Sequence, residues 1–349
     1  MNLYSTTAKA TMMTLMILYA VAFSAHAQGM EEANGINSFD ANQKGILIAN
    51  GVNVKAEPMK LHHAINSPYE DLKPRLADGG KRLYFSRTFY PGNVNGVNDP
   101  EDIWYSDFDA TTNEWSAPKH MADGLNNAGP NYIDNVSVTG DTVILGNQYL
   151  KKGKMRDGLS YSVNVKGIWS APVSINIKND YNISQHAGSF VSLKTGVIIR
   201  SVERDESIGG RDLFVSFWNG QQATEPVNMG AAINTEFEES SPYLASDNKT
   251  LYFASEGHDG FGGFDIYVTH RLDDTWTNWS TPENLGPAVN GALDDEFFSV
   301  SSCGTYAVFS KQVSVHDHDL YRMSMDELFR KEKVTTPEVK GKLSAFTSL

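Results

Sequence analysis

A repeat of about 55 residues is the feature that most restricts how this chain can fold. Its clearest marker is a short apolar strand followed by a small or polar residue, which starts at Leu83, Val143, Val197, Leu251 and Tyr306. The steps between these starts are 60, 54, 54 and 55 residues. A fixed period of this size is typical of repeat architectures, in which each unit buries its apolar faces against its neighbours.

Two further markers follow the apolar strand in most units. A second strand begins with an aspartate, at Asp102, Asp212, Asp265 and Asp319. The second unit departs from this pattern, with Gly158 at the expected position. The third marker is a strand that ends near proline, as in Trp279-Ser280-Thr281-Pro282. With a short first strand added, each unit is predicted to be a four-stranded antiparallel sheet, because β-branched and aromatic residues alternate and no long helical period occurs.

Five such units predict an all-β fold, a five-bladed β-propeller in which the blades pack in a ring. The last unit lacks its proline-marked outer strand. Residues 52–58 precede the first unit and match that missing strand, since Pro58 lies 60 residues before Pro118. We therefore predict that an N-terminal strand, Val52 to Pro58, closes the last blade, which is built from residues 296–323.

The repeat also resembles a known family. The pattern Asp-Gly-Lys-x-Leu-Tyr-Phe-Ser, then Gly-Gly-x-Asp-Ile-Tyr, then Trp-Ser-x-Pro, is similar to the TolB-type, WD-repeat-like propeller repeats of bacterial envelope proteins, and residues 236–290 carry it best. The resemblance covers about residues 52–323. It implies a propeller that works in the cell envelope, as in proteins with an OmpA-like domain and in proteins of the type IX secretion apparatus.

The ends of the chain suggest an exported protein. Residues 1–27 read as a signal peptide, with Lys9, an apolar stretch from Met12 to Phe23 and the small-residue site Ala25-His26-Ala27. Gln28 follows the site, so a lipoprotein anchor is not expected. We predict a flexible leader over 28–51, a propeller over 52–323, and a short helix over 325–332 within a loose C-terminal segment, 324–349. The expected location is periplasmic or secreted, with no transmembrane segment after cleavage.

Composition excludes several functions. The formal net charge of −13 argues against nucleic acid as a partner, because binding its phosphates needs clustered Lys and Arg. A single cysteine, Cys303, excludes a disulfide framework and a cysteine-based zinc site. The sequence contains no nucleotide-binding or catalytic signature, so we predict no cofactor, no metal and no catalytic residues.

Acidic residues just before the predicted inner strands are candidate binding residues at the mouth of the central channel: Glu70, Asp134, Glu239 and Glu296. Two or three carboxylates in such a place could flank a sugar, as they do in glycosidases. Alternatively, they are turn residues that recur with the repeat. The repeated Asp102, Asp212, Asp265 and Asp319 are interpreted as structural, because a repeat needs the same residue in each blade whereas an active site needs different ones.

The tryptophans before proline, Trp115, Trp169 and Trp279, could stack on sugars, but their repeated spacing favours packing between blades. The sequence thus predicts a non-catalytic interaction or scaffold module of the envelope with protein partners. Two alternatives stay open, a glycan-active enzyme of the five-bladed type and a carbohydrate-binding module. An asymmetric set of carboxylates at the channel mouth would favour the enzyme over the scaffold.

Overall fold

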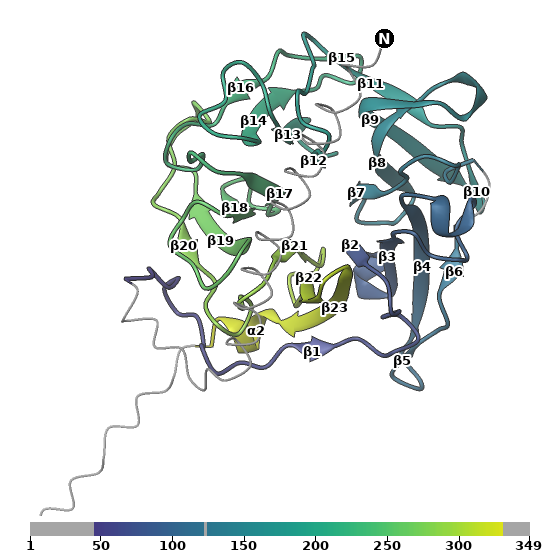
Figure 1. Ribbon diagram of the computed structural model, residues 1–349, viewed down its shortest axis with the longest axis horizontal. Helices are drawn as coiled ribbons and strands as arrows, with labels where there is room; N and C mark the ends of the chain where they lie inside the picture. Colours follow the sequence, from purple (N-terminus) through teal and green to yellow (C-terminus); the bar gives the residue numbers. More distant parts are fainter. Residues whose placement is uncertain (1–44, 122–123, 331–349) are drawn as a thin grey trace, which may run out of the picture. The chain divides into compact units, whose positions relative to one another are not determined.

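Five small antiparallel sheets surround a central axis in the computed structural model, which describes residues 45–121 and 124–330 (Figure 1). The repeat is therefore a five-bladed β-propeller, as predicted. The predicted signal peptide, most of the predicted leader and the end of the predicted C-terminal segment lie outside the described residues. No described helix is long and apolar enough to cross a membrane.

Each blade runs from an inner strand to an outer one, and the first four follow the chain in order. Blade 1 contains β2 (Asp71–Ala77), β3 (Arg82–Arg87), β4 (Asp102–Asp109) and β6 (Lys119–His120), with β5 (Glu114–Trp115) paired to the end of β4. Blade 2 contains β7 (Ile133–Val136), β8 (Thr142–Tyr149), β9 (Met155–Val165) and β11 (Val173–Ile177), with β10 (Ile168–Trp169) paired to β9. Blade 3 contains β12 (Gly188–Val191), β13 (Val197–Val202), β14 (Asp212–Phe217) and β16 (Val227–Asn228). The short β15 (Gln222–Ala223) runs parallel to β11 and so ties blade 3 to blade 2.

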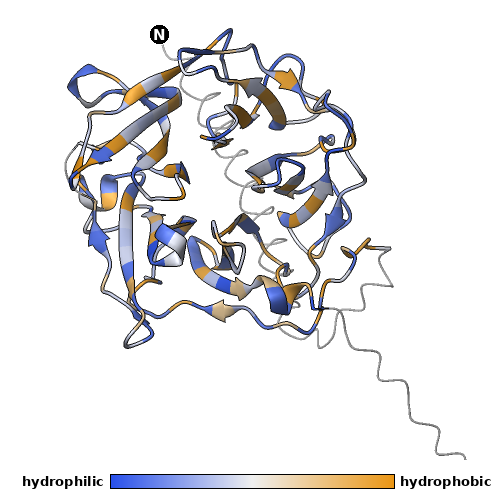
Figure 2. Ribbon diagram, turned by 180° about the vertical axis from the view of Figure 1, so that it is seen from behind, coloured by the Kyte–Doolittle hydropathy of each residue, from blue (hydrophilic) through white to orange (hydrophobic). Residues whose placement is uncertain are grey.

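The last two blades complete the ring. Blade 4 contains β17 (Glu239–Leu244), β18 (Thr250–Ser255), β19 (Asp265–His270) and β20 (Glu283–Asn284). Blade 5 contains β21 (Asp295–Val300), β22 (Tyr306–Ser314) and β23 (Asp317–Ser324), and its outer strand is β1 (Met59–Lys60). Three 3-10 turns, η2 (Asp78–Gly80), η3 (Gly96–Asn98) and η4 (Lys151–Gly153), lie in hairpin loops. Figure 2 shows hydrophobic residues concentrated in the strands and hydrophilic residues in the loops between them.

The N-terminal strand closes the last blade, but not over the residues predicted. Met59 and Lys60 pair antiparallel with Arg322 and Tyr321. Residues 52–58 form turns and coil instead, because Pro58 has no N–H to donate and the ladder begins only after it. This segment still joins the two ends of the ring, since the Asn53 N–H donates to the Leu328 carbonyl at 2.7 Å.

The C-terminal helix is shorter than predicted. α2 covers Met325–Leu328, whereas we expected a helix to residue 332. It starts at Met325 as predicted, and the Ser324 hydroxyl caps this end by accepting the Glu327 N–H at 3.4 Å.

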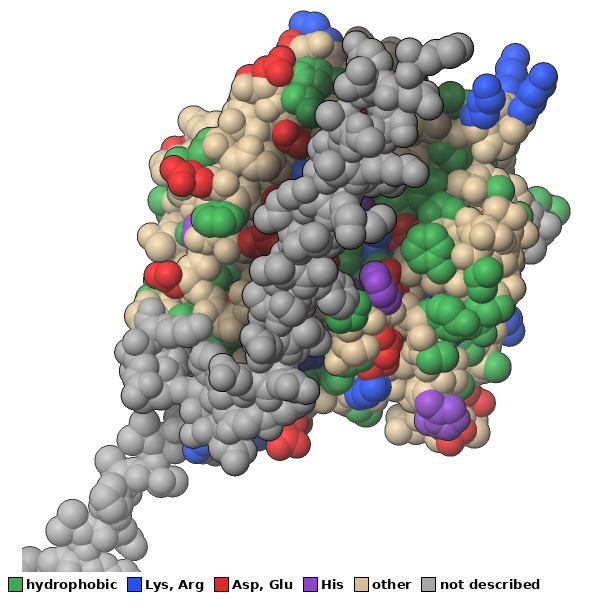
Figure 3. Space-filling model, in the orientation of Figure 1, with side chains coloured by type: hydrophobic (Ala, Val, Ile, Leu, Met, Phe, Trp, Pro, Cys, Tyr) green, Lys and Arg blue, Asp and Glu red, His purple; other side chains and the backbone are tan. Residues whose placement is uncertain are grey.

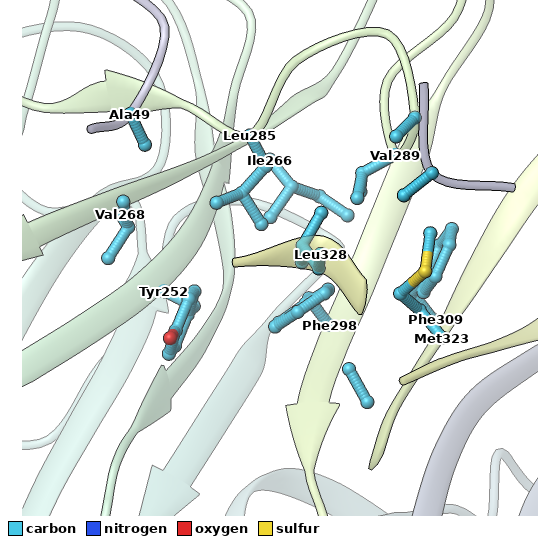
Figure 4. Close-up of a cluster of buried hydrophobic side chains, with 13 residues drawn as sticks. Ala49, Tyr252, Ile266, Val268, Leu285, Val289, Phe298, Phe309, Met323 and Leu328 are labelled. Atoms are coloured by element: carbon cyan, nitrogen blue, oxygen red, sulfur yellow. The ribbon is translucent and has the colours of Figure 1, made fainter. Parts of the chain in front are cut away.

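Apolar side chains fill the spaces between blades. Five buried clusters are found, one at each junction of neighbouring blades. Between blades 4 and 5, Tyr252 and Ile266 face Phe298, Phe309 and Met323 (Figure 4). Burial of one such side chain stabilises the fold by roughly 1.5–3 kcal/mol, so the blades are held mainly by face-to-face packing.

An asparagine links each of four blade junctions through its side-chain amide. In the preceding blade, one residue of the third strand follows the repeated aspartate directly. The asparagine amide donates to the carbonyl of that residue and accepts its N–H, as the peptide of a neighbouring strand would. The pairs are Asn66 with Leu320, Asn126 with Ile103, Asn234 with Leu213, and Asn290 with Ile266.

Candidate functional site

The inner strands β2, β7, β12, β17 and β21 line the central channel (Figure 1). Four of them begin at, or just after, a buried polar residue that accepts a backbone N–H from four residues earlier. The pairs are Asp71 with Ser67 at 2.6 Å, Asn131 with Asn127 at 2.6 Å, Glu239 with Thr235 at 2.9 Å, and Asp295 with Gly291 at 2.5 Å. These contacts fix the turn that enters each inner strand.

The four predicted channel-mouth carboxylates do not occupy equivalent positions in the blades. Glu239 is one of the four residues that fix these turns. Glu296 is not, because in its blade Asp295 fixes the turn and Glu296 is the next residue. Glu70 lies one residue before Asp71, and Asp134 lies three residues beyond Asn131. A one-residue shift turns a side chain to the other face of a strand, so the four carboxylates do not form a set of equivalent residues around the channel.

Their contacts differ accordingly. The Glu296 carboxylate accepts the hydroxyls of Ser240 at 2.8 Å and Ser241 at 3.1 Å, which brings it beside the strand that starts at Glu239. Glu239 also accepts the Ser255 hydroxyl at 2.8 Å, and burial raises its pKa to about 7. Glu70 lies apart from this pair and accepts the Thr88 hydroxyl at 2.7 Å. A role for these residues in ligand binding stays a prediction.

Asp134 also has a raised pKa, and its carboxylate has fewer hydrogen bonds than that of Glu239. Its side chain is buried, and desolvation raises its pKa to about 7 against the opposing attraction of Arg75. Oδ1 accepts the Ser189 N–H at 3.4 Å, while Oδ2 has no hydrogen-bond partner among the described residues. The Arg75 guanidinium does not bond this carboxylate directly but donates to the backbone carbonyl of Asp134 at 2.7 Å.

The repeated aspartates at the start of the third strands each bond a polar residue of the outer strand. The pairs are Asp102 with His120 at 2.7 Å, Asp212 with Asn228 at 2.6 Å, Asp265 with Asn284 at 3.1 Å, and Asp319 with Lys60. Three of them also accept a backbone N–H from the loop before the strand, donated by Val94, Ile208 and Phe261. Such contacts join strand, loop and outer strand, which is the arrangement that a structural role requires.

A polar pocket of about 350 Å³ opens at the channel mouth between blades 1, 2 and 3. We call it the blade 2–3 pocket; its lining includes Lys73, Glu101, Tyr132, Asn147, Met155, Arg156, Asp157, Asn182, Gln185 and His186. No residue predicted from the sequence as a site residue lines it. The one sequence feature that marks this region is the second unit's deviation from the repeat, where Gly158 replaces the repeated aspartate and directly follows Asp157.

Charged groups in this pocket are held in defined positions. Lys73 donates to Glu101 at 2.6 Å and lies over the Tyr132 ring, 4.2 Å from its centroid. Both carboxylate oxygens of Asp157 accept hydrogen bonds from Nη2 of Arg200, at 2.9 and 3.0 Å. Arg200 is fully buried and also pairs with Asp180, so it holds Asp157 at the pocket wall from behind. The wall is therefore pre-organised, and the Asp157 side chain, which is 36% exposed, can still accept hydrogen bonds from a ligand.

A second cavity of about 450 Å³ opens at the opposite ends of the inner strands. Its lining includes Arg75, Phe190 and Tyr243 together with Ser and Asn side chains from the turns after these strands. Tyr243 is not free to contact a ligand through its hydroxyl, because this group donates to the Val300 carbonyl at 2.7 Å. The Tyr243 hydroxyl is therefore not counted among the groups of this cavity that could bind a ligand.

The three tryptophans pack against the clusters between blades. Trp279 is 4% exposed within the cluster of blades 3 and 4, and Trp115 and Trp169 lie against two other clusters. Within the described residues, no group of three or more His, Cys, Asp or Glu side chains is arranged to hold a metal ion.

No protein-family model matches the chain, and no curated protein matches it. Solved structures do resemble it. BT0996, in a complex named for RGII, aligns with a TM-score of 0.50 at 8% identity over 78% of this protein and 92% of that one. An α-L-arabinofuranosidase from Podospora anserina aligns at 0.48, with 12% identity over 79% of this protein and 98% of that one. The protein named TolB from Agrobacterium tumefaciens aligns at 0.44, with 14% identity over 77% and 84%. At such identities the likeness shows the propeller fold alone.

Proposed function

We propose that this propeller binds a carbohydrate in the blade 2–3 pocket, as a binding module without turnover. The observation that carries the proposal is the pocket wall, where the exposed Gln185 amide stands beside the half-buried Asn147 amide and the Asp157 carboxylate. The Asn182 amide positions this wall, since it donates to the His186 carbonyl and accepts the Ser184 and Glu203 N–H groups. A sugar is covered with hydroxyls that both donate and accept, and planar amides and carboxylates supply matching partners.

The size and position of the pocket support the same proposal. At about 350 Å³ it falls within the range of small-ligand sites, and the side chains of three blades converge on it. Met155 and Tyr132 add apolar surface to the polar wall. Solved propellers of this fold include carbohydrate-active enzymes, but the proposal rests on the pocket and not on that likeness.

Affinity electrophoresis against a panel of plant and bacterial polysaccharides tests this function, followed by calorimetry with the best ligand. The double variant His186→Ala/Gln185→Ala removes two exposed wall residues, so folding should be unaffected. We expect binding to weaken by about tenfold or more, the effect of losing one or two hydrogen bonds. The matched control is Lys194→Ala/Ser302→Ala at the opposite mouth, which should bind like the wild type. Failure of the wild type to bind any polysaccharide in the panel would overturn the proposal.

Hydrolysis of a glycan is the second candidate, favoured by one observation. The pKa of Asp134 is raised to about 7, the range in which a general acid works. A second carboxylate, Glu101, lies in the pocket and is bonded to Lys73, whose charge also acts on Asp134. Binding is preferred because the carboxylate of Asp134 is buried and the side chain is only 3% exposed.

We further propose that the protein is exported and works in the cell envelope, where it also contacts protein partners of an outer-membrane or type IX secretion assembly. The support is the N-terminal sequence and the resemblance of the repeat to TolB-type propellers. Sequencing the N-terminus of the protein from a periplasmic fraction tests export, and a start at Gln28 is expected. Crosslinking within envelope fractions tests for the partners.

A further inference from the structure

The tip of the β8–β9 hairpin carries a dense positive charge. Lys151, Lys152, Lys154 and Arg156 lie within six residues, in a chain whose formal net charge is −13. All four are exposed, and none forms an ion pair with another described residue. Figure 3 shows that acidic side chains are spread over the visible face, whereas Lys and Arg are confined to a few groups.

This charge is built into the edge of the blade 2–3 pocket. The hairpin pairs Gln148 with Arg156 and Tyr149 with Met155 before it turns through η4. Arg156 and Met155 line the pocket, so the same ladder continues from the pocket wall to the lysines at the tip. Arg156 is held in place by its bond to the Gln148 side chain, an uncharged partner that leaves its charge uncompensated.

The other charges of the pocket nearly cancel. Lys73 pairs with Glu101, and the buried Arg200 is shared by Asp157 and Asp180, which leaves one negative charge beside the four cations of the hairpin. The hairpin tip therefore gives the pocket edge an excess positive charge, in contrast to the acidic character of the whole protein. Positive potential beside a binding site attracts anionic ligands and fixes their orientation.

We infer that the carbohydrate bound here is an anionic one, a polysaccharide that carries carboxylates, with one sugar in the pocket and the following sugars along the β8–β9 hairpin. This inference rests on the proposed function and specifies its ligand class. A polysaccharide fits better than a single charged sugar, because the lysines extend beyond the pocket along the hairpin.

The experiment compares sodium polygalacturonate with the same polymer after reduction of its carboxyl groups. The test variant is Lys151→Gln/Lys152→Gln/Lys154→Gln, and the control is Lys55→Gln/Lys81→Gln/Lys166→Gln, which removes the same charge from exposed residues elsewhere. We expect the test variant to bind polygalacturonate about tenfold more weakly, from the loss of three charge contacts, and the control to bind like the wild type. The affinity of the wild type should fall with added salt more steeply than that of the test variant.

Three results would overturn the inference. These are equal binding of the reduced polymer, an unchanged affinity in the test variant, and binding to anionic lipid vesicles but to neither polymer. The proposed function is judged separately by the His186→Ala/Gln185→Ala variant. If this variant loses the reduced polymer while the lysine variant keeps both polymers, the pocket binds sugars and only the anionic class is wrong.

Discussion

The side-chain amide of Asn66 donates to the Leu320 carbonyl at 3.2 Å and accepts the Leu320 N–H at 2.8 Å, across 254 positions of the chain. The pair joins the start of the propeller to its last blade at the place where the ring closes. Asn290 makes the same two bonds to Ile266, at a junction between blades that are consecutive in the chain. The two junctions are thus built alike, and only one of them closes the ring.

Replacing Asn66 by Ala should lower the free energy of unfolding by about 1–3 kcal/mol, because a buried N–H and a buried carbonyl lose their partners. Asn290→Ala is the matched control and should lower it by a similar amount. Urea denaturation followed by tryptophan fluorescence measures both. If only Asn290→Ala were destabilising, the closing junction would contribute nothing and the ring would be open in solution.

The repeat was sufficient to predict the blades because it depends on local patterns. Apolar residues such as Val197 and Leu251 start strands that must face a neighbouring blade, and the number of such strands gives the number of blades. The closing strand was misplaced because Pro58 looked like the marker of the outer strand. Its missing N–H instead delays pairing until Met59.

The pocket could not be predicted in the same way. Its residues stand at different positions of different blades, so no repeated pattern marks them. Arg200 in β13 reaches Asp157 in β9 of the preceding blade, and these two residues are 43 positions apart in the chain. The predicted carboxylates do not recur at equivalent positions, because Glu296 lies one residue beyond Asp295 and a one-residue step changes which face of a strand a side chain occupies.

Asp265→Asn should lower the free energy of unfolding by about 1 kcal/mol, the scale of one hydrogen bond, since the carboxylate accepts from the Phe261 N–H and the Asn284 amide. Carbohydrate binding should be unchanged, because the residue lies in blade 4, outside the blade 2–3 pocket. The exposed Asp205→Asn is the control for loss of one negative charge. Loss of binding at full stability would show that the repeated aspartates act in function and not only in structure.

Protein stability should decline as the pH rises from about 4 to about 7 and should level off above the folded pKa values. Burial raises the pKa of Asp71 to about 6 and those of Asp134, Glu239 and Asp295 to about 7. Between about pH 4 and 7 the folded protein therefore binds protons that the unfolded chain has released. The stabilisation from these protons is complete below pH 4 and is lost as the pH passes the folded pKa values.

The Asp134→Asn variant isolates one of these groups. An amide does not titrate, so the slope of stability against pH should become shallower by up to about 1.4 kcal/mol per pH unit. Urea denaturation at intervals from pH 5 to pH 8 gives both slopes, with Asp205→Asn as control. Parallel curves for wild type and Asp134→Asn would mean that Asp134 does not hold its proton in the folded state.

Assays for hydrolysis decide between a binding module and an enzyme. Catalysis requires two carboxylates about 5–9.5 Å apart, one of them with a raised pKa and both reachable by the substrate. Asp134 meets the pKa condition but is buried, whereas Glu101 reaches the pocket and is occupied by Lys73 and by the Ser86 hydroxyl at 2.5 Å. We therefore expect no turnover of aryl glycosides or of the polysaccharides that bind, in the wild type as in Asp134→Asn and Glu101→Gln. The protein would instead be a glycoside hydrolase if the wild type turned over a substrate and either change abolished this turnover but not binding. The control, Asp247→Asn at the opposite mouth, should then remain active.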